Sequence, residues 1–181
     1  MQVIKTKIEG VVVLEPRVFG DDRGYFFESY TAKAFEREIP GVCFVQDNEA
    51  KSRYGVLRGL HYQLPPHAQS KLVRVVRGRI LDVAVDIRRG SPTFGQHVAW
   101  ELSGENRQQL FIPKGFAHGY VVLSEETVMM YKCDDYYFPE YERGIRFDDP
   151  ALRVDWGIPA EHLILSEKDR KQPFWGEADI F

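Results

Sequence analysis

The chain has 181 residues, of which 44% are hydrophobic and 28% are charged. This composition is typical of a globular protein with a sizeable core and excludes a largely disordered chain. Lysine and arginine number 24 against 27 acidic residues, which gives a net charge of −3. Nothing in this balance favours a nucleic-acid partner.

The first residues, MQVIKTKIEG, lack the long apolar stretch of a signal peptide, and no later stretch approaches membrane-spanning length. The two cysteines, Cys43 and Cys133, stand in apolar or strand-like sequence without metal-type spacing. We expect both to be reduced and structural. We therefore expect a cytoplasmic protein without a membrane partner.

Most of the chain reads as short β-strands, rich in β-branched and aromatic residues and separated by Gly, Pro, Asp or Asn. Thr31 is an N-cap candidate for the one clear helix, and Arg77-Gly78 predicts a tight hairpin between two later strands. In chain order, we expect strands at 11–19 and 25–30, a helix at 31–39, strands at 42–50, 56–63, 71–76, 79–87, 97–102, 108–112, 117–123 and 128–133, and a helical or irregular segment at 161–170.

No internal repeat, low-complexity tract or flexible linker divides the chain. We therefore expect residues 1–181 to form a single domain. Many short strands at regular spacing predict a mainly β fold, an antiparallel sandwich or a closed barrel such as the jelly roll.

An arginine and a histidine stand inside the predicted strand 56–63, VLRGLHYQ. Arg58 and His61 would point to opposite faces of a flat strand. Gly59 between them is typical of a β-bulge, which would turn both side chains towards one cavity. The alternative is a histidine satisfied by a hydrogen bond in the core, and these residues alone leave both interpretations open.

Lys71 begins the predicted strand 71–76, KLVRVV. Alternation places it on the same face as Val73 and Val75. A cation beside two valines needs an anionic or carbonyl partner. The alternative is a lysine at a strand end whose amine extends into water.

The segment 111–120, FIPKGFAHGY, contains P-x-G-x-x-H ending at His118. This spacing resembles the second motif of cupins, small β-barrels that usually hold a metal through histidines and a glutamate. The first cupin motif needs a second histidine shortly after the first, but His61 is followed by Tyr62 and Gln63. It also needs an acidic ligand further along, where this chain has Lys71. A metal site requires several protein ligands, so we expect a cupin-like barrel without a metal.

Tyr131 and Tyr137 are six residues apart in YKCDDYY, so a regular strand would place both on one face. Packing on a half-buried strand is the ordinary interpretation. A phenol directed into a cavity could instead be a general acid or stack on a base or sugar. Asp169 lies in a polar tail, and it would fix the tautomer of His61 if it folded back onto it.

In combination and order, these segments resemble the dTDP-4-dehydrorhamnose 3,5-epimerase family of the cupin superfamily. The resemblance extends over nearly the whole chain, and the combination is more specific than any single motif. It is carried by DDRGYFFE (21–28), FVQDNEAKS (44–52), GVLRGLHYQ (55–63), the segment 70–95, FIPKGFAHGY (111–120), YKCDDYYFPEYERGI (131–145) and ILSEKD (164–169).

The resemblance implies an isomerase that inverts carbons 3 and 5 of dTDP-4-dehydro-6-deoxy-D-glucose. The product would be dTDP-4-dehydro-L-rhamnose, formed through enolates and without a cofactor, in dTDP-L-rhamnose biosynthesis. This chemistry is accessible because a carbanion next to a ketone delocalises onto the oxygen. The alternatives are an epimerase of only one centre, a 3,4-ketoisomerase, and a non-catalytic nucleotide-sugar-binding module.

By the same resemblance, His61 is the base that removes the proton, and Asp169 supports it. Tyr131 is the acid that returns a proton to the opposite face of the sugar. Lys71 lies near the keto oxygen and stabilises the enolate. Tyr137 matches the aromatic residue that stacks on thymine.

The resemblance also implies two phosphate-binding arginines, Arg23 and Arg58, whose bidentate geometry suits a diphosphate. Because the family forms homodimers, Arg23 and Glu28 are expected to reach the site of the partner chain. The remaining substrate-lining positions are Gln46, Asp47, Asn48, His118, Glu142 and Lys168.

Overall fold

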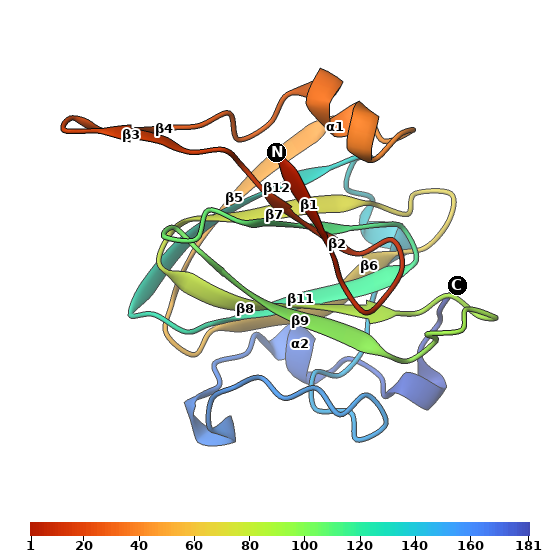
Figure 1. Cartoon of the computed structure of the whole chain (residues 1–181). Coiled ribbons are helices and arrows are strands. Elements are labelled where there is room, and N and C mark those ends of the chain that lie inside the picture. The colour runs from red at the N-terminus through yellow and green to blue at the C-terminus, as the bar shows by residue number, and fades with distance from the viewer.

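The structure is a computed structural model and describes residues 1–181. Two antiparallel sheets face each other and enclose an apolar interior (Figure 1). The six-stranded sheet contains, in spatial order, β1 (Gln2–Lys5), β2 (Val12–Glu15), β10 (Gln109–Ile112), β7 (Lys71–Arg77), β12 (Glu126–Cys133) and β5 (Gln46–Arg53). The five-stranded sheet contains β13 (Glu142–Gly144), β6 (Leu57–Gln63), β11 (Phe116–Val122), β8 (Arg79–Asp86) and β9 (His97–Ser103).

Strand alternation decides which side chains fill the interior. Val73 and Val75 of β7 belong to the interior cluster of 15 buried residues, whereas Leu72 between them packs on the outer face of the sheet. The face that Lys71 shares with Val73 and Val75, as alternation predicted, is therefore the interior face. Burial of such side chains contributes about 1.5–3 kcal/mol each and is the main force holding the sheets together.

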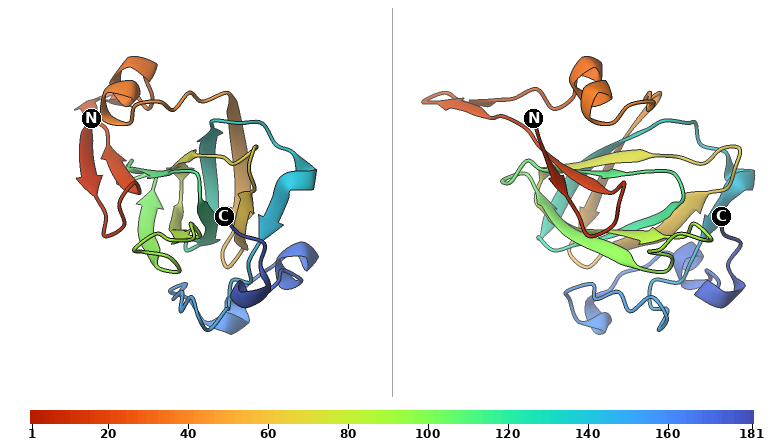
Figure 2. Two further views of the ribbon diagram at one scale, coloured as in Figure 1. Left: turned by 90° about the vertical axis from the view of Figure 1, so that its right-hand side faces the viewer. Right: turned by 45° about the vertical axis from the view of Figure 1, so that its right-hand side comes forward.

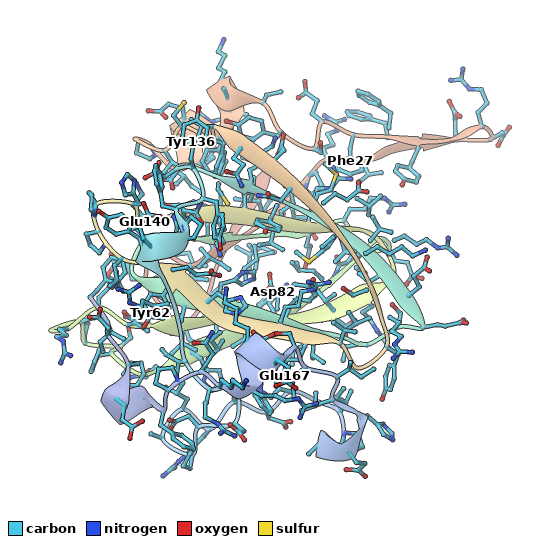
Figure 3. All side chains as sticks on the ribbon, turned by 180° about the vertical axis from the view of Figure 1, so that it is seen from behind. Phe27, Tyr62, Asp82, Tyr136, Glu140 and Glu167 are labelled. Atoms are coloured by element: carbon cyan, nitrogen blue, oxygen red, sulfur yellow. The ribbon has the colours of Figure 1, made fainter.

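A two-stranded arm extends away from the body (Figure 1). It consists of β3 (Phe19–Asp21) and β4 (Gly24–Phe26). Its aromatic side chains are open to solvent, with Tyr25 58% and Phe26 67% exposed. Phe27 lies where the arm meets the body (Figure 3), and the Arg74 guanidinium stands 5.4 Å from the centre of its ring.

The helix α1 (Ala32–Glu38) covers the outer face of the six-stranded sheet. Phe35, its one buried residue, packs against Leu72 and Phe111. The predicted helix is confirmed. Thr31 occupies the N-cap position but makes no side-chain capping bond.

The C-terminal segment covers the outer face of the five-stranded sheet (Figure 2). Val83 and Val85 of β8 point outwards into this layer, where they form a second cluster with Trp156. η1 (Pro139–Tyr141) comes before β13, and the segment after β13 contains η2 (Ala160–His162), α2 (Glu167–Arg170) and η3 (Trp175–Glu177). None of the helices is long and apolar enough to cross a bilayer.

The mainly β antiparallel jelly-roll class is confirmed, and every predicted strand region contains a strand. The predicted hairpin at Arg77-Gly78 is wrong, because β7 and β8 pair with different strands and belong to different sheets. The chain crosses the barrel there instead. Both cysteines are free, but only Cys133 is buried; Cys43 is exposed.

Candidate active site

Strands β6 and β11 place two histidines side by side. His61 pairs with His118 and Arg58 pairs with Tyr120, so β6 has one more residue than β11 between the two pairs. This is the β-bulge that Gly59 predicted. A Cβ on Gly59 would lie 2.4 Å from the backbone of β11, so no other residue fits without a shift.

The side chains of these two pairs, Arg58, His61, His118 and Tyr120, all line one cavity between the sheets because of the bulge. The cavity has two adjoining compartments of about 330 and 560 Å³, which lie in the size range of small-molecule sites. His61, Lys71 and Tyr131 line both compartments. The smaller one is also lined by Gln46, Asn48, Gln63, Gln69, Cys133, Tyr137 and Glu142. The larger one is also lined by Arg58, His118, Tyr120, Ser166, Lys168 and Asp169.

His61 is held by a buried carboxylate from the C-terminal tail. Its Nε2 lies 2.6 Å from Oδ1 of Asp169, whose other oxygen accepts a hydrogen bond from the Ser166 hydroxyl at 2.6 Å. Two backbone hydrogen bonds attach this tail at the start of β6: the Leu57 N–H donates to the Ile164 carbonyl, and the Ile164 N–H donates to the Gly55 carbonyl. The structure therefore makes the contact between His61 and Asp169 that the sequence could not show.

Burial would raise the pKa of Asp169, but the hydrogen bonds from His61 and Ser166 outweigh it and the pKa lies below its ordinary value. Asp169 is thus an anion at neutral pH. When the Nε2–H of His61 donates a hydrogen bond to this anion, the neutral imidazole carries its lone pair on Nδ1. The pair has the composition of a general base with an orienting carboxylate.

A phenol and an ammonium group come from the opposite sheet. Tyr131 on β12 pairs across the strands with Val73 of β7, and the Lys71 amine stands 5.9 Å from the centre of its ring. Burial raises the pKa of Tyr131 to about 12, so the phenol keeps its proton. Burial lowers the pKa of Lys71.

A second imidazole–carboxylate pair lies deeper in the interior. His118 Nε2 is 2.5 Å from Oδ1 of Asp82, and both side chains are buried. Figure 3 shows Asp82 between the sheets, and its Oδ2 has no hydrogen-bond partner. Asp82 was not predicted from the sequence, although alternation along RILDVAVDI places this acid on the apolar face with Ile80 and Ala84.

Tyr137 lies at the rim of the smaller compartment, 52% exposed. Its hydroxyl donates to Oε2 of Glu142 at 2.7 Å, and Lys168 forms an ion pair with the same oxygen. The expectation that Tyr131 and Tyr137 share one strand face is wrong, because β12 ends at Cys133. A turn then brings Tyr137 to the cavity from the side.

Three of the predicted residues do not line this cavity in their own chain. Arg23 is at the tip of the arm, where its side chain is 90% exposed and pairs with Asp21. Glu28 is exposed beyond β4. Asp47 is paired with Lys132 outside the cavity.

An imidazole–carboxylate pair and a protonated phenol that line one cavity inside an antiparallel jelly roll are typical of a cupin-like barrel enzyme for acid–base chemistry on a small molecule. The family model described as dTDP-4-dehydrorhamnose 3,5-epimerase matches residues 5–177. The chain belongs to this family, as the sequence resemblance indicated.

Similar proteins agree with this assignment. The dTDP-4-dehydrorhamnose 3,5-epimerase of Pseudomonas aeruginosa is 54% identical over 182 residues, covering 100% of this chain and 99% of the relative. A crystal structure of the Legionella pneumophila dTDP-6-deoxy-D-glucose-3,5-epimerase in complex with dTDP-4-keto-L-rhamnose superposes with a TM-score of 0.95 at 50% identity, covering 98% and 94% of the two chains. A 3'-monoepimerase from Streptomyces bikiniensis in complex with dTDP-quinovose has a TM-score of 0.86 at 32% identity, covering 94% and 86%.

Proposed function

We propose that the chain is an isomerase that inverts carbons 3 and 5 of dTDP-4-dehydro-6-deoxy-D-glucose to give dTDP-4-dehydro-L-rhamnose, in dTDP-rhamnose biosynthesis. The observation that carries the proposal is the pair of proton-transfer groups on opposite walls of one cavity, His61 with Asp169 on one side and Tyr131 on the other. Residues 1–181 act as one domain in this proposal.

Each inversion is a proton removal followed by a proton return to the other face. His61 takes the hydrogen next to the ketone, and the Asp169 anion stabilises the imidazolium that forms. The electron pair moves onto the keto oxygen as an enolate, beside the Lys71 ammonium. Tyr131 donates its proton to the opposite face of the carbon. Since carbons 3 and 5 both flank the ketone, the same groups can serve both centres once solvent has taken the proton from His61 and returned one to Tyr131.

The rest of the cavity binds the nucleotide part of the substrate. Arg58 binds the diphosphate with its guanidinium. The exposed ring of Tyr137 stacks on thymine. The other predicted lining residues that reach the cavity complete the substrate-binding set: Gln46, Asn48, His118, Glu142 and Lys168.

The active form is a homodimer in this proposal, in which the arm carries Arg23 and Glu28 to the partner's cavity. Two features support it: the arm extends from the body, and it exposes Phe19, Tyr25 and Phe26 to solvent. Isolated two-stranded ribbons with exposed aromatic side chains are unstable in water, so we expect a second chain to pack against these side chains and stabilise the arm. Asp47, whose side chain pairs with Lys132 outside the cavity, contributes only by its position on β5 between Gln46 and Asn48.

A single-centre epimerase is the second candidate, because the 3'-monoepimerase shares the fold. Proton NMR in deuterium oxide with dTDP-4-dehydro-6-deoxy-D-glucose decides between the two. We expect deuterium at both carbon 3 and carbon 5 of the product. Deuterium at only one carbon would overturn the double inversion, and no exchange at either would overturn the epimerase assignment.

A further inference from the structure

Tyr120 is a buried residue of the cavity to which the proposed reaction assigns no task. It is 5% exposed and lies on β11 with its ring packed in the interior cluster. Its hydroxyl has no hydrogen-bond partner, although the side chain lines the same compartment as Arg58 and Tyr131. Buried hydroxyl groups without a partner are uncommon and costly, so this one calls for an explanation.

None of the polar neighbours of this hydroxyl accepts its proton. The neighbours are the guanidinium of Arg58, its cross-strand partner on β6, the hydroxyl of Ser52, and the carboxylate of Asp82, its cross-strand partner on β8. Asp82 holds His118 through Oδ1, and its Oδ2, like the Tyr120 hydroxyl, has no hydrogen-bond partner, so this carboxylate does not reach the phenol. A guanidinium only donates hydrogen bonds. The Ser52 oxygen already accepts from both Nε and Nη2 of Arg58, each at 3.3 Å, which uses its two lone pairs.

We propose that the Tyr120 hydroxyl donates a hydrogen bond to a phosphoryl oxygen of the bound nucleotide diphosphate. This inference rests on the proposed function, in which Arg58 binds the diphosphate. An anion bound by Arg58 would provide the missing acceptor, because its oxygen atoms lie beside the phenol and have lone pairs that can accept a hydrogen bond. Burial raises the pKa of Tyr120, so the hydroxyl keeps the proton it donates.

The arrangement favours phosphate over the sugar ring as the acceptor. Arg58 is an exposed residue on β6, so its guanidinium is open to an incoming anion. Hydrogen bonds to charged acceptors are shorter and stronger than bonds to neutral oxygens. Tyr120 would thus be a substrate-binding residue, separate in task from the phenol of Tyr131.

Tyr120→Phe is the direct test, since it removes only the hydroxyl. We expect the Kd for dTDP, measured by calorimetry, and the KM for the sugar nucleotide to rise by the same factor, about tenfold. We expect kcat and the Kd for thymidine, which has no phosphate, to stay unchanged. Tyr54→Phe is the matched control, because that hydroxyl bonds His162 at the surface, and it should leave both constants unchanged.

A double-mutant cycle separates a phosphate contact from an effect on folding. In an Arg58→Ala background the diphosphate is no longer held next to Tyr120, so Tyr120→Phe should have little further effect on dTDP binding. An unchanged Kd for dTDP in Tyr120→Phe would overturn the proposal, as would a fall in kcat with normal dTDP binding. A tenfold loss that persists unchanged without Arg58 would also overturn it.

The dTDP measurement needs no turnover, so the two proposals can fail separately. A wild-type protein that binds dTDP but does not exchange the sugar protons would refute the epimerase assignment, and the Tyr120→Phe binding result would still decide the hydroxyl contact. A wild-type protein that does not bind dTDP would refute both.

Discussion

His61 and Tyr131 line the same cavity from opposite sheets, His61 on β6 and Tyr131 on β12. Inversion at a carbon next to a ketone requires proton removal from one face and proton return to the other. A single group that did both would restore the starting centre. Because the two groups stand on different walls, substitution can separate their tasks.

His61→Ala should lower kcat about a thousandfold or more, because the general base is lost. Binding of dTDP should stay within about threefold of the wild-type value, since the phosphate and thymine contacts are elsewhere. Turnover by NMR and dTDP affinity by calorimetry measure the two effects. His162→Ala, at the surface beside Tyr54, is the matched control and should retain full turnover. Near-normal turnover of His61→Ala would refute the assigned base.

Tyr131→Phe should separate exchange from inversion. The base can still remove the proton and return deuterium from the same face, so the starting sugar should take up deuterium without changing configuration. Formation of the inverted product should fall about a thousandfold. Time-resolved NMR in deuterium oxide follows both processes. Inverted product formed at the wild-type rate would show that another group is the acid.

Asp169→Asn should make stability less dependent on pH. The pKa of Asp169 is lower in the folded chain than its ordinary value of 3.8, so ionised Asp169 stabilises the fold above that pH. This contribution is lost as the pH falls through the folded pKa. Denaturant unfolding should therefore show the variant less stable by about 2 kcal/mol at pH 7, with the difference shrinking in acid. A difference that grows below pH 3.8 would contradict the assignment.

Mixed dimers test whether the arm acts on the partner chain. Arg23→Ala and His61→Ala should each be inactive alone. In a mixed dimer one cavity would combine an intact His61 with an intact Arg23 from the partner, so co-expression should restore about a quarter of wild-type activity. If mixing restores nothing, Arg23 does not act across the interface. Sedimentation should give the mass of a dimer.

Gly59→Ala should destabilise the protein by about 3 kcal/mol or more and abolish activity, because the bulge places both Arg58 and His61. The glycine has φ of +135°, and a Cβ would strike the neighbouring strand. Gly24→Ala is the matched control for stability: its φ is also +135°, but nothing lies within 4 Å of the added carbon. Equal losses in the two variants would show that backbone strain alone matters.

Local sequence predicted the strands and α1, because β-branched alternation and helical spacing are properties of neighbouring residues. It also indicated the bulge at Gly59 and placed Lys71 on the same strand face as Val73 and Val75. It did not predict which strands pair. The apparent turn at Arg77-Gly78 joins two sheets instead of two hydrogen-bonded strands.

The residue types of the site can be read from the sequence, and the family resemblance suggested their proposed tasks. Their hydrogen-bond partners follow only from the packing of the folded chain. His61 meets Asp169 across 108 positions of chain, and His118 meets Asp82 across 36. Such contacts depend on how two sheets and a tail pack together, because burial of their apolar faces brings distant polar groups within reach. The same packing left the Tyr120 hydroxyl without an acceptor.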